Sequence, residues 1–166
     1  MRQWFATIPM TRSEAVVNLQ VLYGPPSQAG FGSAVFRDRV ERAEDLEAAA
    51  LRHYRYFLGK TWEHFGEEVW MGPWQRVYQR QAADRRDIVT ELRRITDPVA
   101  QSSVTMVLDA IADPEAGRQA LAAVYDDAEM DTLMVYTLGD GAALSGLLIA
   151  GRDRQGETIL LVFLLD

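Results

Sequence analysis

The chain has 166 residues, of which 48% are hydrophobic and 25% charged, with a formal net charge of −7, a composition typical of a globular protein in solution. It contains no cysteine, which excludes a disulfide framework and a thiolate metal site, and no apolar run approaches the roughly 18 residues of a membrane span. Residues 1–9 are too short and too interrupted for a signal peptide. We therefore expect one cytoplasmic domain spanning residues 1–166.

Residues 11–23 carry two competing patterns. Thr11 and Glu14 have the spacing of a capping box. Apolar residues then follow at helical period: Ala15, Val16, Leu19, Leu22 and Tyr23. The odd-numbered residues from 15 to 23 are also apolar, as a strand would require. We favour the helix because the cap and the spacing agree, and we expect it to end in loop 24–30, whose two prolines cannot continue it.

Two long amphipathic helices are predicted next, over residues 33–58 and 73–95. In the first, an apolar stripe recurs at three- and four-residue steps: Val40, Ala43, Leu46, Ala50, Leu51, Tyr54 and Phe57. In the second, the inward residues are Trp74, Val77, Tyr78, Ile88, Val89, Leu92 and Ile95. Gly59 interrupts the first helix, and a less regular helical segment over 61–71 follows it.

The C-terminal part of the chain combines two short helices with three strands. Asp97-Pro98 and Asp113-Pro114 are typical of an N-cap aspartate followed by proline at the first helical position, which predicts helices over 98–112 and 114–125. The strands are predicted at 132–138, 143–152 and 157–165, with glycine-containing turns between them.

The last strand has no polar side chain from residue 159 to 165. Both of its faces must therefore be covered, and it must lie inside a sheet or pair across a homodimer interface. We predict an α+β fold in which a helical N-terminal two-thirds packs on a C-terminal three-stranded antiparallel meander.

Known catalytic and metal-binding motifs are not found. On one helix, the only two histidines, His53 and His64, would lie about 16 Å apart along the axis, too far to share a metal. No serine occupies a nucleophile elbow, and Gly139-Asp140-Gly141 is followed by a predicted strand, so it suits a hairpin turn better than a phosphate cradle. No catalytic residue, metal or cofactor is predicted.

The aromatic residues are concentrated between residues 54 and 78, which hold half of all the aromatics in the chain. Core packing explains most of such a cluster. Tyr56, Trp62 and Trp70 depart from the inward stripes, however, and together with His64 they are candidates for an apolar pocket or an interface.

Charge is distributed unevenly along the chain. Residues 1–95 carry 14 basic and 12 acidic side chains, a balance of +2, whereas residues 96–166 carry 3 and 12, a balance of −9. This asymmetry argues against nucleic acid or membrane as a partner and favours a basic protein, although acidic surfaces also simply favour solubility. The candidate contact residues are Asp126, Asp127, Glu129 and Asp131.

Two functions are compatible with these observations. The first is a non-enzymatic protein–protein interaction module, such as an adaptor, inhibitor or immunity-type protein, that uses the acidic half or the aromatic patch. The alternative is a small-molecule binding protein or enzyme with an aromatic-lined pocket around residues 53–74.

Overall fold

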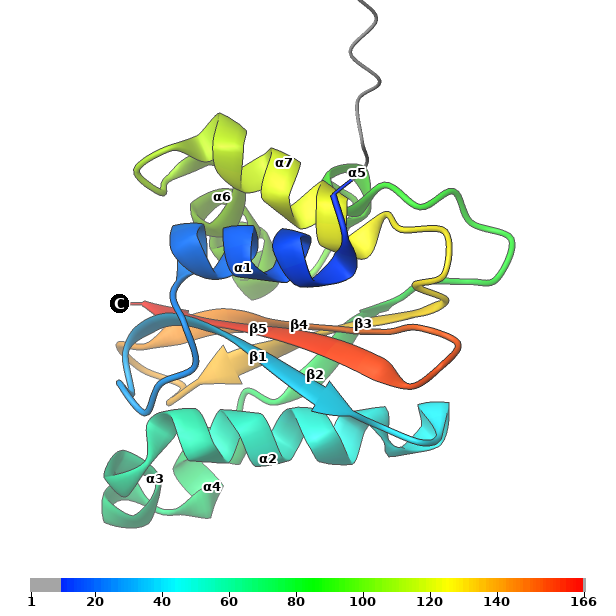
Figure 1. The fold of residues 1–166 in the computed structure, drawn as a ribbon. Coiled ribbons are helices and arrows are strands. Elements are labelled where there is room, and N and C mark those ends of the chain that lie inside the picture. Colours follow the sequence, from blue (N-terminus) through cyan, green and yellow to red (C-terminus); the bar gives the residue numbers. More distant parts are fainter. Residues whose placement is uncertain (1–9, 166) are drawn as a thin grey trace, which may run out of the picture.

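The protein is built on a five-stranded antiparallel sheet with helices on both faces (Figure 1). The structure, a computed structural model, describes residues 10–165, so the prediction made for residues 1–9 falls outside it. The strand order is β1-β5-β4-β3-β2. The strands are β1 (Gly32–Arg39), β2 (Gln75–Gln79), β3 (Thr132–Gly139), β4 (Ser145–Arg152) and β5 (Glu157–Leu165).

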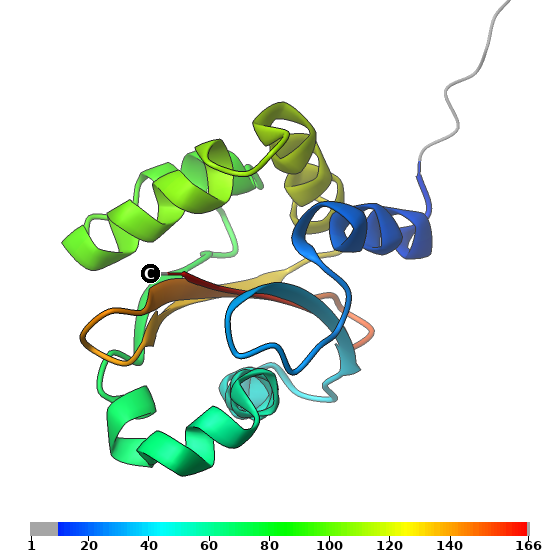
Figure 2. The same cartoon turned by 90° about the vertical axis from the view of Figure 1, so that its left-hand side faces the viewer.

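The helices form one layer on each side of the sheet (Figure 2). One layer contains α1 (Arg12–Tyr23), α5 (Ile88–Arg93), α6 (Pro98–Asp109) and α7 (Pro114–Tyr125). The other contains α2 (Leu46–Leu58), α3 (Lys60–Phe65) and α4 (Glu67–Met71), with a short 3₁₀ turn, η1 (Ala43–Asp45), before α2. Within residues 10–165, none of the helices combines the length and the apolarity needed to cross a membrane.

The predicted arrangement of a helical N-terminal part on a three-stranded meander is wrong. Two of the five strands, β1 and β2, come from residues 33–58 and 73–95, which were predicted as long helices. The apolar runs at 34–36 and 77–78 are too short to distinguish a helix from a strand by their period. Pairing with distant strands decides the matter: β1 pairs along its whole length with β5, and β2 pairs with β3.

The prediction for the final strand is confirmed. β5 lies between β1 and β4 in the interior of the sheet. Its side chains at 159, 161 and 163 belong to the core under α1, α6 and α7, and those at 160, 162 and 164 belong to the core over α2. Both faces of β5 are therefore buried, which explains why this stretch has no polar side chain.

Local capping signals are also confirmed. The Thr11 hydroxyl accepts a hydrogen bond from the Glu14 amide at 3.1 Å, so residues 12–23 form a helix and not a strand. Asp97 and Asp113 cap α6 and α7, each accepting from an amide three residues later. These contacts satisfy donors that an uncapped helix would leave free.

Candidate functional site

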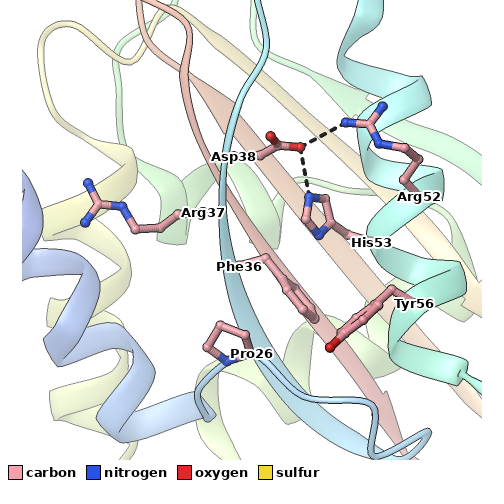
Figure 3. Close-up of a pocket in the computed structure, with 7 residues that line it drawn as sticks. All are labelled: Pro26, Phe36, Arg37, Asp38, Arg52, His53 and Tyr56. Atoms are coloured by element: carbon pink, nitrogen blue, oxygen red, sulfur yellow. Dashed lines mark hydrogen bonds and ion pairs between the residues drawn. The ribbon is translucent and has the colours of Figure 1, made fainter.

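A cleft of about 510 Å³ opens between β1 and α2, at the edge of the sheet (Figure 3). It is lined by Pro26, Phe36, Arg37, Asp38, Arg52, His53 and Tyr56. A second hollow of about 610 Å³ shares Arg52 and Tyr56 with the cleft and adds basic residues, including Arg55 and Lys60. Both hollows open to solvent, and together they combine aromatic, basic and imidazole side chains.

Alternation along β1 and the helical period of α2 bring these side chains together. Phe36 and Asp38 are two residues apart on the strand, so both face α2. Arg37, between them, extends to the opposite face (Figure 3). There it pairs with Glu157. On α2, His53 and Tyr56 are three residues apart and therefore lie on one side of the helix.

A polar cluster forms one end of the cleft. The Asp38 Oδ2 atom accepts hydrogen bonds from His53 Nε2 at 2.9 Å and from an Arg52 guanidinium nitrogen at 3.0 Å. Partial burial acts to raise the pKa of Asp38, but the hydrogen bonds from His53 and the Arg39 amide, with the charges of His53 and Arg52, hold that pKa below its ordinary value. Because the Asp38 carboxylate can only accept, His53 carries a hydrogen on Nε2.

Aromatic rings form the other wall of the cleft. The Phe36 ring lies 4.9 Å from the His53 ring and 5.9 Å from the Tyr56 ring, which it meets edge-on. Phe36 is only 4% exposed, whereas Tyr56 is 51% exposed. The result is a buried apolar floor with an accessible aromatic side chain at its rim, an arrangement typical of contact sites.

The structure separates the aromatic residues that the sequence had grouped as a site. Trp62 and Trp70 are only 6% and 2% exposed and belong to the core over α2. The sequence pattern had pointed to a role outside the core for both. His64 is exposed on α3 and packs against Phe65, away from the cleft. Of this group, only Tyr56 lines the cleft, although Trp62 reaches the neighbouring hollow.

The acidic connector before β3 is largely neutralised by the protein's own arginines. Asp127 lies 3.4 Å from Arg12, and Asp131 pairs with Arg86 and Arg154 at 2.6 and 2.7 Å.

Asp126 is half-buried and accepts a hydrogen bond from the Ile88 amide at 2.7 Å. Burial raises the pKa of Asp126 to about 6, against the opposing effects of the Ile88 amide and of Arg80, which lies 3.9 Å away. Within residues 10–165, Glu129 is the one acid of the four that forms no ion pair.

The sequence pattern did not indicate Phe36, Asp38 or Arg52 as site residues, and it indicated His53 only as a metal-ligand candidate and as the first residue of the alternative pocket at 53–74. A single helix over 33–58 would have placed Phe36 and His53 about 25 Å apart along its axis. The signal that could have found the site is the two-residue spacing of Phe36 and Asp38, which puts both on one face only in a strand.

Comparisons of the chain with protein-family models, with curated proteins and with solved structures found no match. Among residues 10–165, no cluster of three or more histidine, cysteine or acidic side chains could hold a metal ion. The candidate site therefore has to be interpreted from its own geometry.

Proposed function

We propose that this protein is a protein–protein interaction module and that its contact site is the cleft between β1 and α2. The observation that carries the proposal is Tyr56, which is 51% exposed beside the buried Phe36 ring. Tyrosine and arginine are enriched among the residues that dominate binding energy at interfaces. In this proposal, a partner places an apolar side chain against Phe36 and Tyr56, and its polar groups meet Arg52 and His53.

The position of the other candidates supports this choice. Trp62 and Trp70 are held in the core, so a partner would reach Tyr56 before either of them. The acidic connector offers a basic partner little free charge, because Asp127 and Asp131 already pair with arginines. An existing ion pair must be broken or shared before such a carboxylate can bind a new cation, which lowers the gain in binding energy.

A random peptide library displayed on phage tests the proposal, with the full chain as bait. We expect enriched peptides that bind the wild type and lose binding to the Tyr56→Ala variant. Phe65→Ala is the matched control, because Phe65 is a similarly exposed aromatic, at 57%, and does not line the cleft. Peptides that bind both variants equally, or no enrichment over an unrelated bait, would contradict the proposal.

A small-molecule ligand is the second candidate function, favoured by the volume of the cleft. About 510 Å³ lies within the range of roughly 300–1,000 Å³ for small-molecule pockets. A fragment screen by NMR separates the two candidates. A fragment that shifts His53 and Tyr56 resonances and is displaced by no peptide would favour the small molecule.

A further inference from the structure

We infer that the cleft's partner is an extended acidic peptide segment that adds as a sixth strand to the free edge of β1, paired at Arg37. This inference rests on the proposed function, because it names the kind of partner that the same cleft would bind. It depends on three features of the edge: the direction of the β1 peptide groups, the surrounding charge, and the faces to which an added strand would point its side chains.

The direction of the peptide groups follows from two hydrogen bonds. The Val35 amide donates to the Gly24 carbonyl at 3.0 Å, away from β5, whereas the Val40 amide donates to the Gly156 carbonyl at 2.9 Å, beside β5. In an antiparallel strand the amide and carbonyl of one residue point to the same side, and successive residues alternate. The peptide groups of Val35, Arg37 and Arg39 therefore face the open edge of the sheet.

Groups of the protein itself form hydrogen bonds with the outward peptide groups at both ends of this edge, at Val35 and Arg39, but not with those of Arg37 between them. The Val35 carbonyl accepts from the Gln20 side chain at 3.2 Å, and the Arg39 amide donates to the Asp38 carboxylate at 2.7 Å. Outside the β1–β5 ladder, the amide and carbonyl of Arg37 take part in no hydrogen bond among the described residues, and the bonds that Arg37 does form come from its side chain. An amide and a carbonyl on one residue are what a single residue of an added antiparallel strand pairs with.

The charge beside this edge favours an acidic segment. The cleft and the adjoining hollow are lined by four basic side chains, Arg37, Arg52, Arg55 and Lys60, and by two acidic ones, Asp38 and Glu63. With Glu157, the ion-pair partner of Arg37, included and histidine counted as neutral, this local balance is +1, in contrast to −7 for the chain as a whole. Asp38 already pairs with Arg52, and Arg37 pairs with Glu157, whereas Arg55 and Lys60 form no ion pair among the described residues. Such an edge attracts negatively charged peptides.

A second copy of the chain fits this edge less well. Two β1 strands related by a two-fold axis at Arg37 would place each Arg37 directly opposite its copy, and like charges in such a pair are destabilising. The inference therefore assigns the edge to a different protein.

The geometry also predicts the pattern of the partner sequence. Residues directly opposite each other in a sheet point to the same face. A residue opposite Phe36 would point toward Tyr56 and His53, and should be aromatic or aliphatic. A residue opposite Arg37 would point to the other face and meet the Arg37 guanidinium, where an acidic side chain would share the ion pair that Arg37 forms with Glu157. Because the added strand runs antiparallel to β1, the expected motif is an acidic residue followed directly by an apolar one in an extended segment.

The test uses a fluorescein-labelled, end-blocked peptide of sequence Glu-Thr-Glu-Tyr-Thr-Glu-Thr and measures its anisotropy with the full chain. Because the added strand is antiparallel, its central Glu-Tyr pair would place the glutamate opposite Arg37 and the tyrosine opposite Phe36. Two N-methylated versions distinguish strand addition from side-chain contact. Methylation of that glutamate amide removes the donor to the Arg37 carbonyl, and should weaken binding by about tenfold, the value of one hydrogen bond. Methylation of the tyrosine amide, which would face solvent, should have less than about a twofold effect.

Protein variants give a second readout. Arg37→Pro removes the outward amide but no hydrogen bond of the β1–β5 ladder, and proline is tolerated on edge strands. We expect Arg37→Pro to weaken binding beyond Arg37→Ala, which keeps the amide and loses only the charge. Phe65→Ala should bind as the wild type does. If Arg37→Pro fails to fold, the pair of N-methylated peptides still decides.

Each remaining outcome has a distinct meaning. Equal effects of the two N-methyl groups, together with a loss of binding in Tyr56→Ala, would overturn strand addition and leave the proposed contact site standing. No binding up to about 1 mM, the limit of weak association, would overturn the acidic-peptide partner. If phage selection also fails, the proposed function fails with it. Self-association of the free chain that Arg37→Pro abolishes would assign the edge to a second copy.

Discussion

The ion pair between Arg80 and Glu91 offers the sharpest test of the described packing. Arg80 follows β2 and Glu91 lies on α5, and their side chains are only 2% and 3% exposed. The guanidinium donates to both carboxylate oxygens at 2.7 and 2.8 Å. Arg80 also donates to the carbonyls of Tyr125 and Met130 at 3.0 and 2.9 Å. This one side chain therefore joins β2, α5 and the connection from α7 to β3.

Glu91→Ala should destabilise the protein by about 3–5 kcal/mol, the cost of leaving a buried charge without its partner. The nearest other carboxylate, that of Asp126, lies 3.9 Å from the guanidinium and would compensate only in part. Since domains of this size are stable by roughly 5–15 kcal/mol, the loss would be a large share of the total.

Urea unfolding followed by tryptophan fluorescence measures this loss, since the chain has 4 tryptophans. Arg93→Ala is the control: it breaks a similar two-contact pair with Asp109, but that pair is exposed, so it should cost less than about 1 kcal/mol. The double variant Arg80→Met/Glu91→Leu should cost less than the sum of its single variants, because it leaves no unpaired charge. A loss below about 1 kcal/mol for Glu91→Ala, or strict additivity, would refute a tightly coupled buried pair.

Three further predictions concern the core and its titration. Leu161→Asp should cost several kcal/mol, because Leu161 is fully buried in β5 with no polar partner; an unchanged melting temperature would show the strand to be peripheral. Backbone amides along β5 should exchange only through global unfolding, since β5 is an interior strand; rapid native-state exchange would contradict this position. Burial raises the pKa of Asp126 to about 6, above about 3.9 for an unfolded aspartate, so the folded state binds the extra proton between these values. The wild type should therefore lose stability relative to Asp126→Asn as the pH rises through this window, and a difference that is constant with pH in urea titrations would disprove the shift.

Individual elements of the fold, though not its arrangement, could be predicted from short stretches of the sequence. The cap at Thr11 and the Asp-Pro pairs at residues 97 and 113 define helix starts, because each supplies an acceptor for free amides within three residues. The apolar run from 159 to 165 predicted an interior strand, because only burial on both faces tolerates it. In each case the information is local: a cap and the amide that it binds are three residues apart, and the apolar run lies within one strand.

The tertiary structure alone decided the rest. Residues 34–36 become a strand because they pair with β5, which lies more than 120 residues further along the chain. Without β1, one edge of β5 would have no strand to pair with. The same pairing makes Phe36 and Asp38 neighbours of His53 and Tyr56, and it leaves the peptide groups of Arg37 facing outward. Strand pairing is a contact between backbones, and neither hydrophobic period nor composition specifies which distant segments will meet. The candidate site exists only where β1 and α2 meet, so it could not be found before the sheet was known.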